Sequence, residues 1–99
     1  MEKDCQCRYK SVPRSEEEKK NLRTRLNRIS GQLSGIGNMI DNDRYCGDIL
    51  IQLSAAENAL HSLGRIIMKN HLETCVTDQI KNGNTQIIDE VMELFDKLG

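Results

Sequence analysis

Apolar residues recur at helical spacing along two long stretches of this chain, and that pattern constrains its fold more than any other feature of the sequence. In the first stretch they follow one another at alternating intervals of four and three residues, at Leu22, Leu26, Ile29, Leu33, Ile36 and Ile40. The same intervals recur in the second stretch, at Ile49, Leu53, Ala56, Leu60, Leu63 and Ile67. Such a repeat lines one side of a helix that packs against other helices. No segment alternates apolar and polar residues as a half-buried strand does, so the sequence predicts an all-α fold.

Turn and capping residues divide the helical pattern into three parts. Ser15 and Glu18 form the S-x-x-E pattern of a capping box and predict a helix that starts there. The DNDR segment at 41–44 predicts a turn, after which one long helix is expected from about residue 44 to about residue 80. The NGN segment at 82–84 predicts its end. A shorter third helix then carries Ile88, Val91, Met92, Phe95 and Leu98.

The length of 99 residues predicts one small domain. We expect residues 1–14 to form a flexible arm and residues 15–99 to form the single folded domain. Only three aromatic residues, Tyr9, Tyr45 and Phe95, are available to a core. A chain of this size buries a modest fraction of its surface, so partner chains are expected to supply further burial.

The sequence lacks targeting signals, which predicts a cytoplasmic protein without a membrane partner. No run of about 18 apolar residues occurs, and the charged N-terminus lacks the apolar stretch of a signal peptide. In a reducing compartment, cysteines serve more often as ligands, sensors or core residues than as disulfide partners. The sequence contains neither a nucleophile–base arrangement nor a phosphate-binding loop, so no enzymatic activity is expected.

Charge is distributed unevenly along the chain although its net value is near zero. Residues 1–40 contain nine lysine and arginine residues against five aspartate and glutamate residues, whereas residues 41–99 contain five against ten. A basic N-terminal part can bind a polyanion such as DNA. A solvated helix face explains the same charges equally well.

The HLETC segment places His71 and Cys75 one helical turn apart on one face of the long helix. Their Cβ atoms are then about 6 Å apart, which suits a metal ion, but two side chains rarely hold one. Cys46 is the next candidate ligand, and it lies near the opposite end of the same predicted helix. At 1.5 Å per residue, about 37 Å of helix separates Cys46 from His71, so one chain cannot bring them together.

Two such helices packed antiparallel would bring these residues together. A twofold dimer builds two equal sites, each with Cys46 from one chain and with His71 and Cys75 from the other. Two thiolates and one imidazole favour Cu(I), Zn(II) or iron–sulfur chemistry. Structural zinc generally needs four ligands, whereas Cu(I) accepts three, so the donor set favours Cu(I). The alternative is that the cysteines are small buried residues and that His71 is a packing residue.

Three segments resemble the copper-sensitive operon repressor (CsoR) family of bacteria, which is related to nickel/cobalt- and formaldehyde-sensing repressors. RLNRISGQLSGI at 25–36 resembles the first-helix motif of that family. DRYCGDILIQLSA at 43–55 resembles the segment with its first metal-binding cysteine, and NHLETCV at 70–76 resembles the segment with its histidine and second cysteine. The resemblance implies a three-helix protomer, an antiparallel four-helix-bundle dimer and a homotetramer that is a dimer of dimers.

The resemblance also implies a function, which is transcriptional repression controlled by metal. Cu(I) is expected to bind between subunits, at Cys46 of one chain and at His71 and Cys75 of the other. The metal-free tetramer is expected to bind operator DNA, and metal binding is expected to release it and so derepress copper-resistance genes. Ni(II) and Zn(II) are alternative metals, and a nickel-sensing branch is an alternative function. Sensing of formaldehyde or persulfide through Cys46, with Cys75 in the persulfide case, is another, although His71 argues against the persulfide branch.

Further positions match functional residues of the family. Tyr45 and Glu90 match a pair that is linked to the metal-binding histidine. A coordinating imidazole offers its other N–H to an acceptor, and Asp89 or Glu93 could replace Glu90 in that role. Guanidinium groups bind phosphates bidentately. The expected DNA-binding residues are Arg25, Arg28 and Gln32, extended by Arg23, Lys19 and Lys20.

The sequence is also compatible with other interpretations. Cys5 and Cys7 form a C-x-C pair in the arm, which could supply accessory ligands or have no specific role. A copper-binding buffer protein without DNA binding is a competing class, which the arginine-rich first helix disfavours. A purely structural helical assembly is a third possibility.

Overall fold

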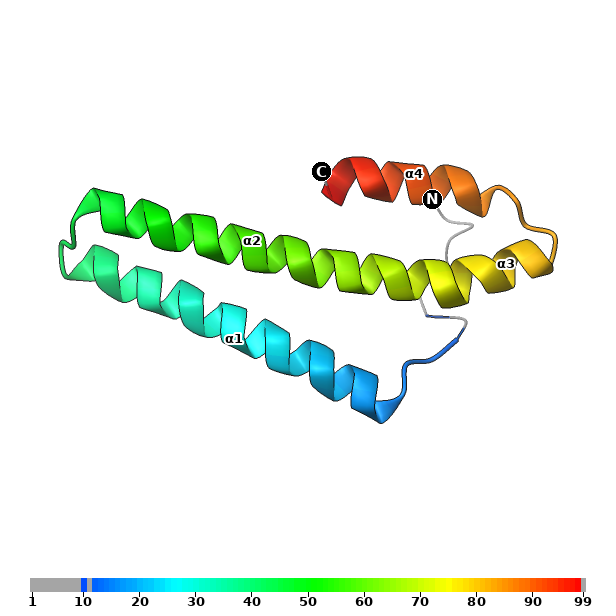
Figure 1. Cartoon of the computed structure of the whole chain (residues 1–99), viewed down its shortest axis with the longest axis horizontal. Coiled ribbons are helices and arrows are strands. Elements are labelled where there is room, and N and C mark those ends of the chain that lie inside the picture. The colour runs from blue at the N-terminus through cyan, green and yellow to red at the C-terminus, as the bar shows by residue number, and fades with distance from the viewer. Residues whose placement is uncertain (1–9, 11, 99) are drawn as a thin grey trace. The chain divides into compact units, whose positions relative to one another are not determined.

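The computed structural model describes residue 10 and residues 12–98. The elements, in chain order, are α1 (Glu16–Asp41), α2 (Cys46–His71), the π-helical turn η2 (Leu72–Val76), α3 (Thr77–Lys81) and α4 (Ile87–Leu98). They form three rods in chain order, namely α1, then α2 with η2 and α3, then α4, because α2, η2 and α3 follow one another without a break (Figure 1). The described residues contain no strand, and the predicted all-α class is confirmed. None of their helices combines the length and apolar character needed to cross a membrane.

The second rod differs from the prediction in one respect. An uninterrupted α-helix was expected over about residues 44–80, but the five residues of η2 form a π-helical turn within it. In such a turn the backbone hydrogen bonds join residues five apart instead of four. The Thr77 hydroxyl supports the wider turn, because it donates a hydrogen bond of 2.8 Å to the carbonyl of Leu72. The prediction was wrong here because an apolar pattern records which face is buried and not how the backbone bonds are paired.

The predicted turn at the DNDR segment follows α1, and it contains a residue in the left-handed conformation. Asp43 has φ 52°, a value that aspartate tolerates better than most residues. The Arg44 amide donates to the Met39 carbonyl at 2.9 Å, and the Asp43 amide donates to the Ile40 carbonyl at 3.1 Å. This pair of bonds is the Schellman motif, which satisfies carbonyls left without partners at a helix end.

The turn after α3 repeats this arrangement with glycine, as the NGN segment predicted. Gly83 has φ 86°, and its amide donates to the Ile80 carbonyl at 3.0 Å. The Asn84 amide donates to the Gln79 carbonyl at 2.9 Å. The side chains of the same two residues also meet, since Asn84 Nδ2 donates to Gln79 Oε1 at 2.7 Å.

The described chain divides into two compact units. Glu16–Arg65 form the hairpin unit, in which α1 and the N-terminal part of α2 lie side by side in antiparallel directions (Figure 1). Residues 66–98, with residue 10 and residues 12–15, form the C-terminal unit. That residues 15–99 act as a single domain stays a prediction. Most of the predicted arm at 1–14 lies outside the described residues.

The hairpin unit buries only part of each apolar stripe. Ile29 and Ile36 of α1 and Ala56 and Leu63 of α2 are buried. Other positions of the two stripes are exposed, and these are Leu26, Leu33 and Ile40 on α1 and Leu53 and Leu60 on α2. Leu33, for example, exposes 50% of its surface. Each stripe therefore has one edge packed inside the hairpin and a second edge that is exposed in the described part of the chain.

The C-terminal unit has a small core that joins η2 to α4. Val76, Ile87 and Val91 are buried together, and the partly buried Leu72 packs against them. The opposite side of α4 remains exposed, with Ile88, Met92 and Phe95. A change in the backbone geometry of η2 would therefore directly alter the packing of α4 in this core.

Replacing Gly83 with alanine should destabilise the protein by about 1–2 kcal/mol, because a Cβ atom disfavours the left-handed conformation by that amount. The matched control is Asp43→Gly, which relieves the same conformation at the equivalent position of the other turn and should not lower stability. Urea denaturation at one fixed protein concentration measures both. Equal destabilisation by the two substitutions would contradict this account of the turns.

Candidate functional site

Cys46 lies at the N-terminal end of the second rod. It is the first residue of α2 and is exposed. The left-handed turn at Asp43 directs the chain into this end, and an ion pair of 3.6 Å between Arg44 and Asp48 spans the first turn of the helix. The thiol is therefore held on a regular helix with one side open to another molecule.

Tyr45 precedes this cysteine and exposes 75% of its surface. Its ring occupies the space beside Gly47, where an added Cβ atom would lie 2.6 Å from a ring carbon. Glycine at position 47 thus permits this placement of the ring. An aromatic side chain this exposed beside Cys46 is available to a partner.

His71 and Cys75 lie at the other end of α2, where the α-helix changes into η2. Cys75 is buried, with 6% of its surface exposed. The Lys10 ammonium donates to Thr74 Oγ1 at 2.7 Å and approaches Cys75 Sγ at 3.4 Å. His71 Nε2 is buried and has no hydrogen-bond partner within residues 10 and 12–98.

Cys46 and His71 are the first and last residues of one continuous helix. Such a helix separates them by about 37 Å, as the sequence predicted. Within the described part of the chain, no group of three histidine, cysteine, aspartate or glutamate side chains is arranged to hold a metal ion. The three candidate ligands are therefore not brought together within a single described chain.

The donor set nevertheless suits a soft metal cation. Thiolate and imidazole ligands bind Cu(I) and Zn(II), and leaving a buried polar atom without a partner costs about 1–3 kcal/mol. The buried Nε2 of His71 is such an atom, and a metal ion is one partner that could satisfy it. Cys75, one turn further along the chain, would contribute its sulfur to the same ion.

The candidate acceptors on α4 differ in burial. Glu90 is half-buried, whereas Asp89 and Glu93 are exposed. All three belong to the same unit as His71. Burial thus favours Glu90 over the other two as the acceptor for the His71 imidazole. A hydrogen bond between Glu90 and His71 stays a prediction.

The basic residues of α1 do not all share one face. An open hollow of about 330 Å³ is lined by Lys20, Arg25 and Arg28 together with Glu17, Asn21 and Thr24. Arg25 is oriented there by Asn21, whose Oδ1 accepts a hydrogen bond of 3.0 Å from Arg25 Nε. This hollow and its rim are named the α1 polar face below.

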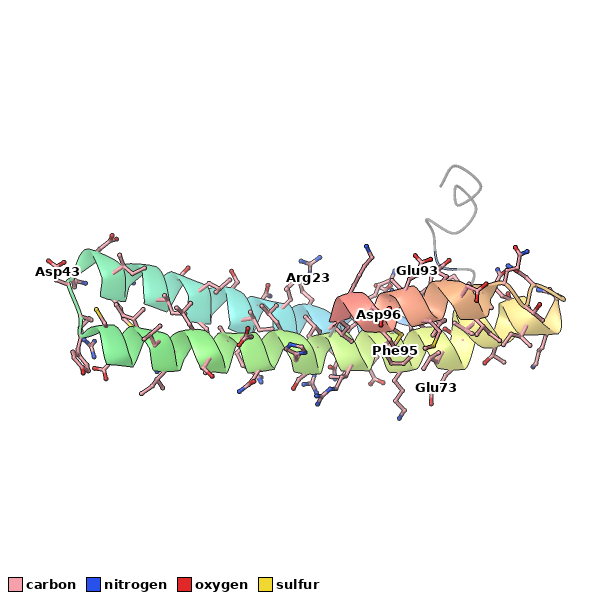
Figure 2. The ribbon with its side chains drawn as sticks, turned by 90° about the horizontal axis from the view of Figure 1, so that it is seen from above. Arg23, Asp43, Glu73, Glu93, Phe95 and Asp96 are labelled. Atoms are coloured by element: carbon pink, nitrogen blue, oxygen red, sulfur yellow. The ribbon has the colours of Figure 1, made fainter. Side chains whose placement is uncertain are left out.

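The remaining candidates lie around that hollow or outside the described residues. Gln32 is partly buried one turn beyond Arg28. Lys19 forms an exposed ion pair of 3.2 Å with Glu16, and Arg23 extends outward from α1 (Figure 2). Neither lines the hollow. Cys5 and Cys7 lie outside the described residues, so their predicted accessory role stays a prediction.

Sequence reasoning missed two features of the candidate site, the π-helical turn and the position of Lys10. The only local signal for the turn is the pair of threonines in 74–77, whose hydroxyls donate to backbone carbonyls at Asn70 and Leu72. Lys10 lies 64 residues before Thr74 in the sequence, and no local pattern connects positions so far apart.

The chain matches a known protein family over most of its length. The profile of the family described as "Metal-sensitive transcriptional repressor" matches residues 18–97. The chain is 44% identical over 85 residues to the copper-sensing transcriptional repressor CsoR of Bacillus subtilis (strain 168), covering 85% of this chain and 84% of that relative. It is 42% identical over 67 residues to the copper-sensing transcriptional repressor RicR of Mycobacterium tuberculosis, covering 68% and 70%.

Two solved structures share the fold. The copper-sensing repressor CsoR with Cu(I) from Geobacillus thermodenitrificans NG80-2 is 37% identical, with a TM-score of 0.84 over 89% of this chain and 93% of that chain. The nickel-responsive transcriptional regulator InrS is 29% identical, with a TM-score of 0.69 over 92% of this chain and 100% of that chain.

The hydroxyl of Thr77 should be needed for the wide turn beside the candidate ligands. We expect Thr77→Val to cost about 1 kcal/mol, the net contribution of one hydrogen bond, and to speed amide hydrogen exchange in residues 72–77. Thr24→Val is the control, because Thr24 makes the corresponding bond of 2.9 Å to the Lys20 carbonyl in a regular α-helix. That change should cost a similar amount and should leave amide exchange in residues 72–77 unchanged. Unchanged exchange in residues 72–77 of Thr77→Val would count against a supporting role for Thr77.

Proposed function

Because the chain belongs to the family of metal-sensitive transcriptional repressors, we propose that it represses transcription in its metal-free form and responds to Cu(I). Operator DNA is its proposed partner. Relatives of this chain named for copper sensing support the choice of metal, as does the similarity to a CsoR structure with Cu(I). The donor set of two cysteines and one histidine supports it independently.

The proposal rests on one observation, namely the positions of the candidate ligands along the second rod. Cys46 begins α2, whereas His71 and Cys75 lie at its far end. The proposed site takes Cys46 from one chain and the other two ligands from a partner packed antiparallel. A twofold axis then produces two equal sites per dimer.

The exposed edges of the apolar stripes support such a dimer. Leu33 of α1 and Leu53 and Leu60 of α2 are exposed in the hairpin unit. Two hairpins that cover these edges form a four-helix bundle, in which burial of apolar area stabilises the assembly by about 25 cal/mol per Å². The homotetramer built from two such dimers is proposed from the resemblance to the family.

The proposed response begins at η2. When Cys75 and His71 turn toward a shared ligand, the π-helical turn that contains Cys75 must adjust. Val76 follows Cys75 and packs against Ile87 and Val91 of α4, so the adjustment reaches α4. Glu90 on the same helix is the proposed acceptor for the second imidazole N–H of His71. Binding of metal and binding of DNA must weaken each other by the same factor.

Ni(II) is a second candidate signal. The similarity to the nickel-responsive regulator InrS favours it, and nickel prefers more than three ligands, often in a planar or octahedral array. Absorption spectroscopy separates the two metals, since a Cu(I) complex is colourless in the visible and a Ni(II)–thiolate complex is coloured.

A mixture of two inactive variants tests whether the site lies between chains. Cys46→Ala chains and His71→Ala chains should each bind Cu(I) weakly when alone. After the two are refolded together, half of the dimers contain one of each chain, and each such dimer has one intact site. We expect about one Cu(I) per four chains, measured by titration against a competing Cu(I) chelator.

The control for that experiment is a mixture of Cys46→Ala chains with Cys46→Ser chains, which can complete no site. A mixture of the first two variants that binds no more Cu(I) than this control would contradict the intersubunit site.

DNA binding should depend on the α1 polar face. Arg25→Ala is expected to weaken operator binding and to reduce the slope of log affinity against log salt by roughly one, the effect of one lost phosphate contact. Lys97→Ala on α4 is the matched control, because it removes a positive charge from outside that face. Fluorescence anisotropy of a labelled promoter fragment at several salt concentrations measures both. An unchanged salt slope in the Arg25 variant would remove this residue from the interface.

A further inference from the structure

Lys10 is held by three acceptors at the metal-binding end of the second rod. Its ammonium group lies 2.7 Å from Thr74 Oγ1, 3.0 Å from the Val12 carbonyl and 3.4 Å from Cys75 Sγ. All of these residues belong to the C-terminal unit. An ammonium group offers three hydrogens, and each has a partner here.

The hydroxyl oxygen of Thr74 is free to accept the hydrogen bond from Lys10 because its own hydrogen is used elsewhere. Its hydroxyl lies 2.7 Å from the Asn70 carbonyl and 3.7 Å from Cys75 Sγ. A hydroxyl has one hydrogen, and the shorter contact to Asn70 uses it. The lone pairs of Thr74 Oγ1 are then directed at other donors, and Lys10 Nζ supplies one. Thr74, which lies in η2 with Cys75, thus positions the Lys10 ammonium group beside Cys75 Sγ.

The ammonium group and a metal cation require the same sulfur. A thiolate binds a metal through its lone pairs, and Lys10 Nζ is within hydrogen-bond distance of that atom in the structure. Two positive charges a few Å apart repel each other strongly where water is scarce, and Cys75 is buried. Lys10 must therefore leave the sulfur before a metal can take it.

We propose that Lys10 is an internal competitor for the metal-binding sulfur of Cys75, so that metal binding releases the chain segment around Lys10. The proposal rests on the proposed function, since it assigns Cys75 to a metal site. Lys10 lies six positions before Glu16, the first residue of α1. Its release frees the segment that leads directly into the helix carrying the α1 polar face.

The test compares full-length wild-type protein with Lys10→Gln, which removes the charge and keeps most of the side-chain length. Cu(I) is supplied from a competing chelator under anaerobic, reducing conditions. Lys10→Gln should bind Cu(I) more tightly by at least about fivefold, the low end of typical coupling between two binding events. Thr74→Val, which removes the oxygen that positions the ammonium group, should shift affinity in the same direction.

Trypsin cleavage after Arg14 reports release of the segment without relying on DNA binding. In the wild-type protein, one equivalent of Cu(I) per site should accelerate this cleavage. In Lys10→Gln, cleavage should already be fast without metal, and Cu(I) should change it little. Lys81→Gln is the control, because it removes an exposed positive charge from the same unit and should behave like wild type in both assays.

The outcomes separate this proposal from the proposed function. Unchanged or weaker Cu(I) affinity in Lys10→Gln, or cleavage after Arg14 that does not respond to Cu(I) in the wild-type protein, overturns the role of Lys10. If operator release by Cu(I) is normal in that case, the copper-responsive function stands. A wild-type protein that binds no Cu(I) overturns both.

Discussion

The stiffness of one long helical rod is the constraint on which the rest of this structure depends. Backbone hydrogen bonds hold α2 at a fixed rise per residue, so Cys46 and His71 at its two ends cannot approach each other. Any site that contains both must use two rods. The exposed apolar edges on α1 and α2 are the surface that a second hairpin would cover, so the spacing of the candidate ligands and the distribution of burial both support the proposed antiparallel dimer.

The two ends of the rod are built differently, and the difference suits their proposed roles. Cys46 is exposed on a regular helix that follows a tight turn. Cys75 is buried in a π-helical turn, beside Thr74 and Lys10. Wide turns of this kind are less stable than the α-helix and recur at functional sites. In the proposed response, the exposed thiol contributes to a site on a partner chain, and a change in the geometry of η2 reaches α4 through Val76, which packs against it.

The first helix carries both a packed apolar edge and a polar hollow. Ile29 and Ile36 pack inside the hairpin, while Arg25 and Arg28 line a polar hollow on the same helix. Residues three or four apart share a helix face, so Arg25 lies next to the packed edge that contains Ile29, whereas Arg28 lies on a different face from Ile29. The hollow and the packed edge are therefore neighbouring surfaces of one helix.

The sequence by itself determined the three helical rods, the turns between them and the residue types able to hold a soft metal. These depend on local physics, namely the spacing of apolar residues, the turn-forming residues of the DNDR and NGN segments and the chemistry of cysteine and histidine. Only the tertiary structure decided which edge of each stripe is buried, where the long helix widens into η2, and that Lys10 lies beside Cys75. An apolar stripe predicts that a helix packs but not which edge packs first. A contact between residues 65 positions apart forms only when the chain folds back on itself, so no local pattern records it.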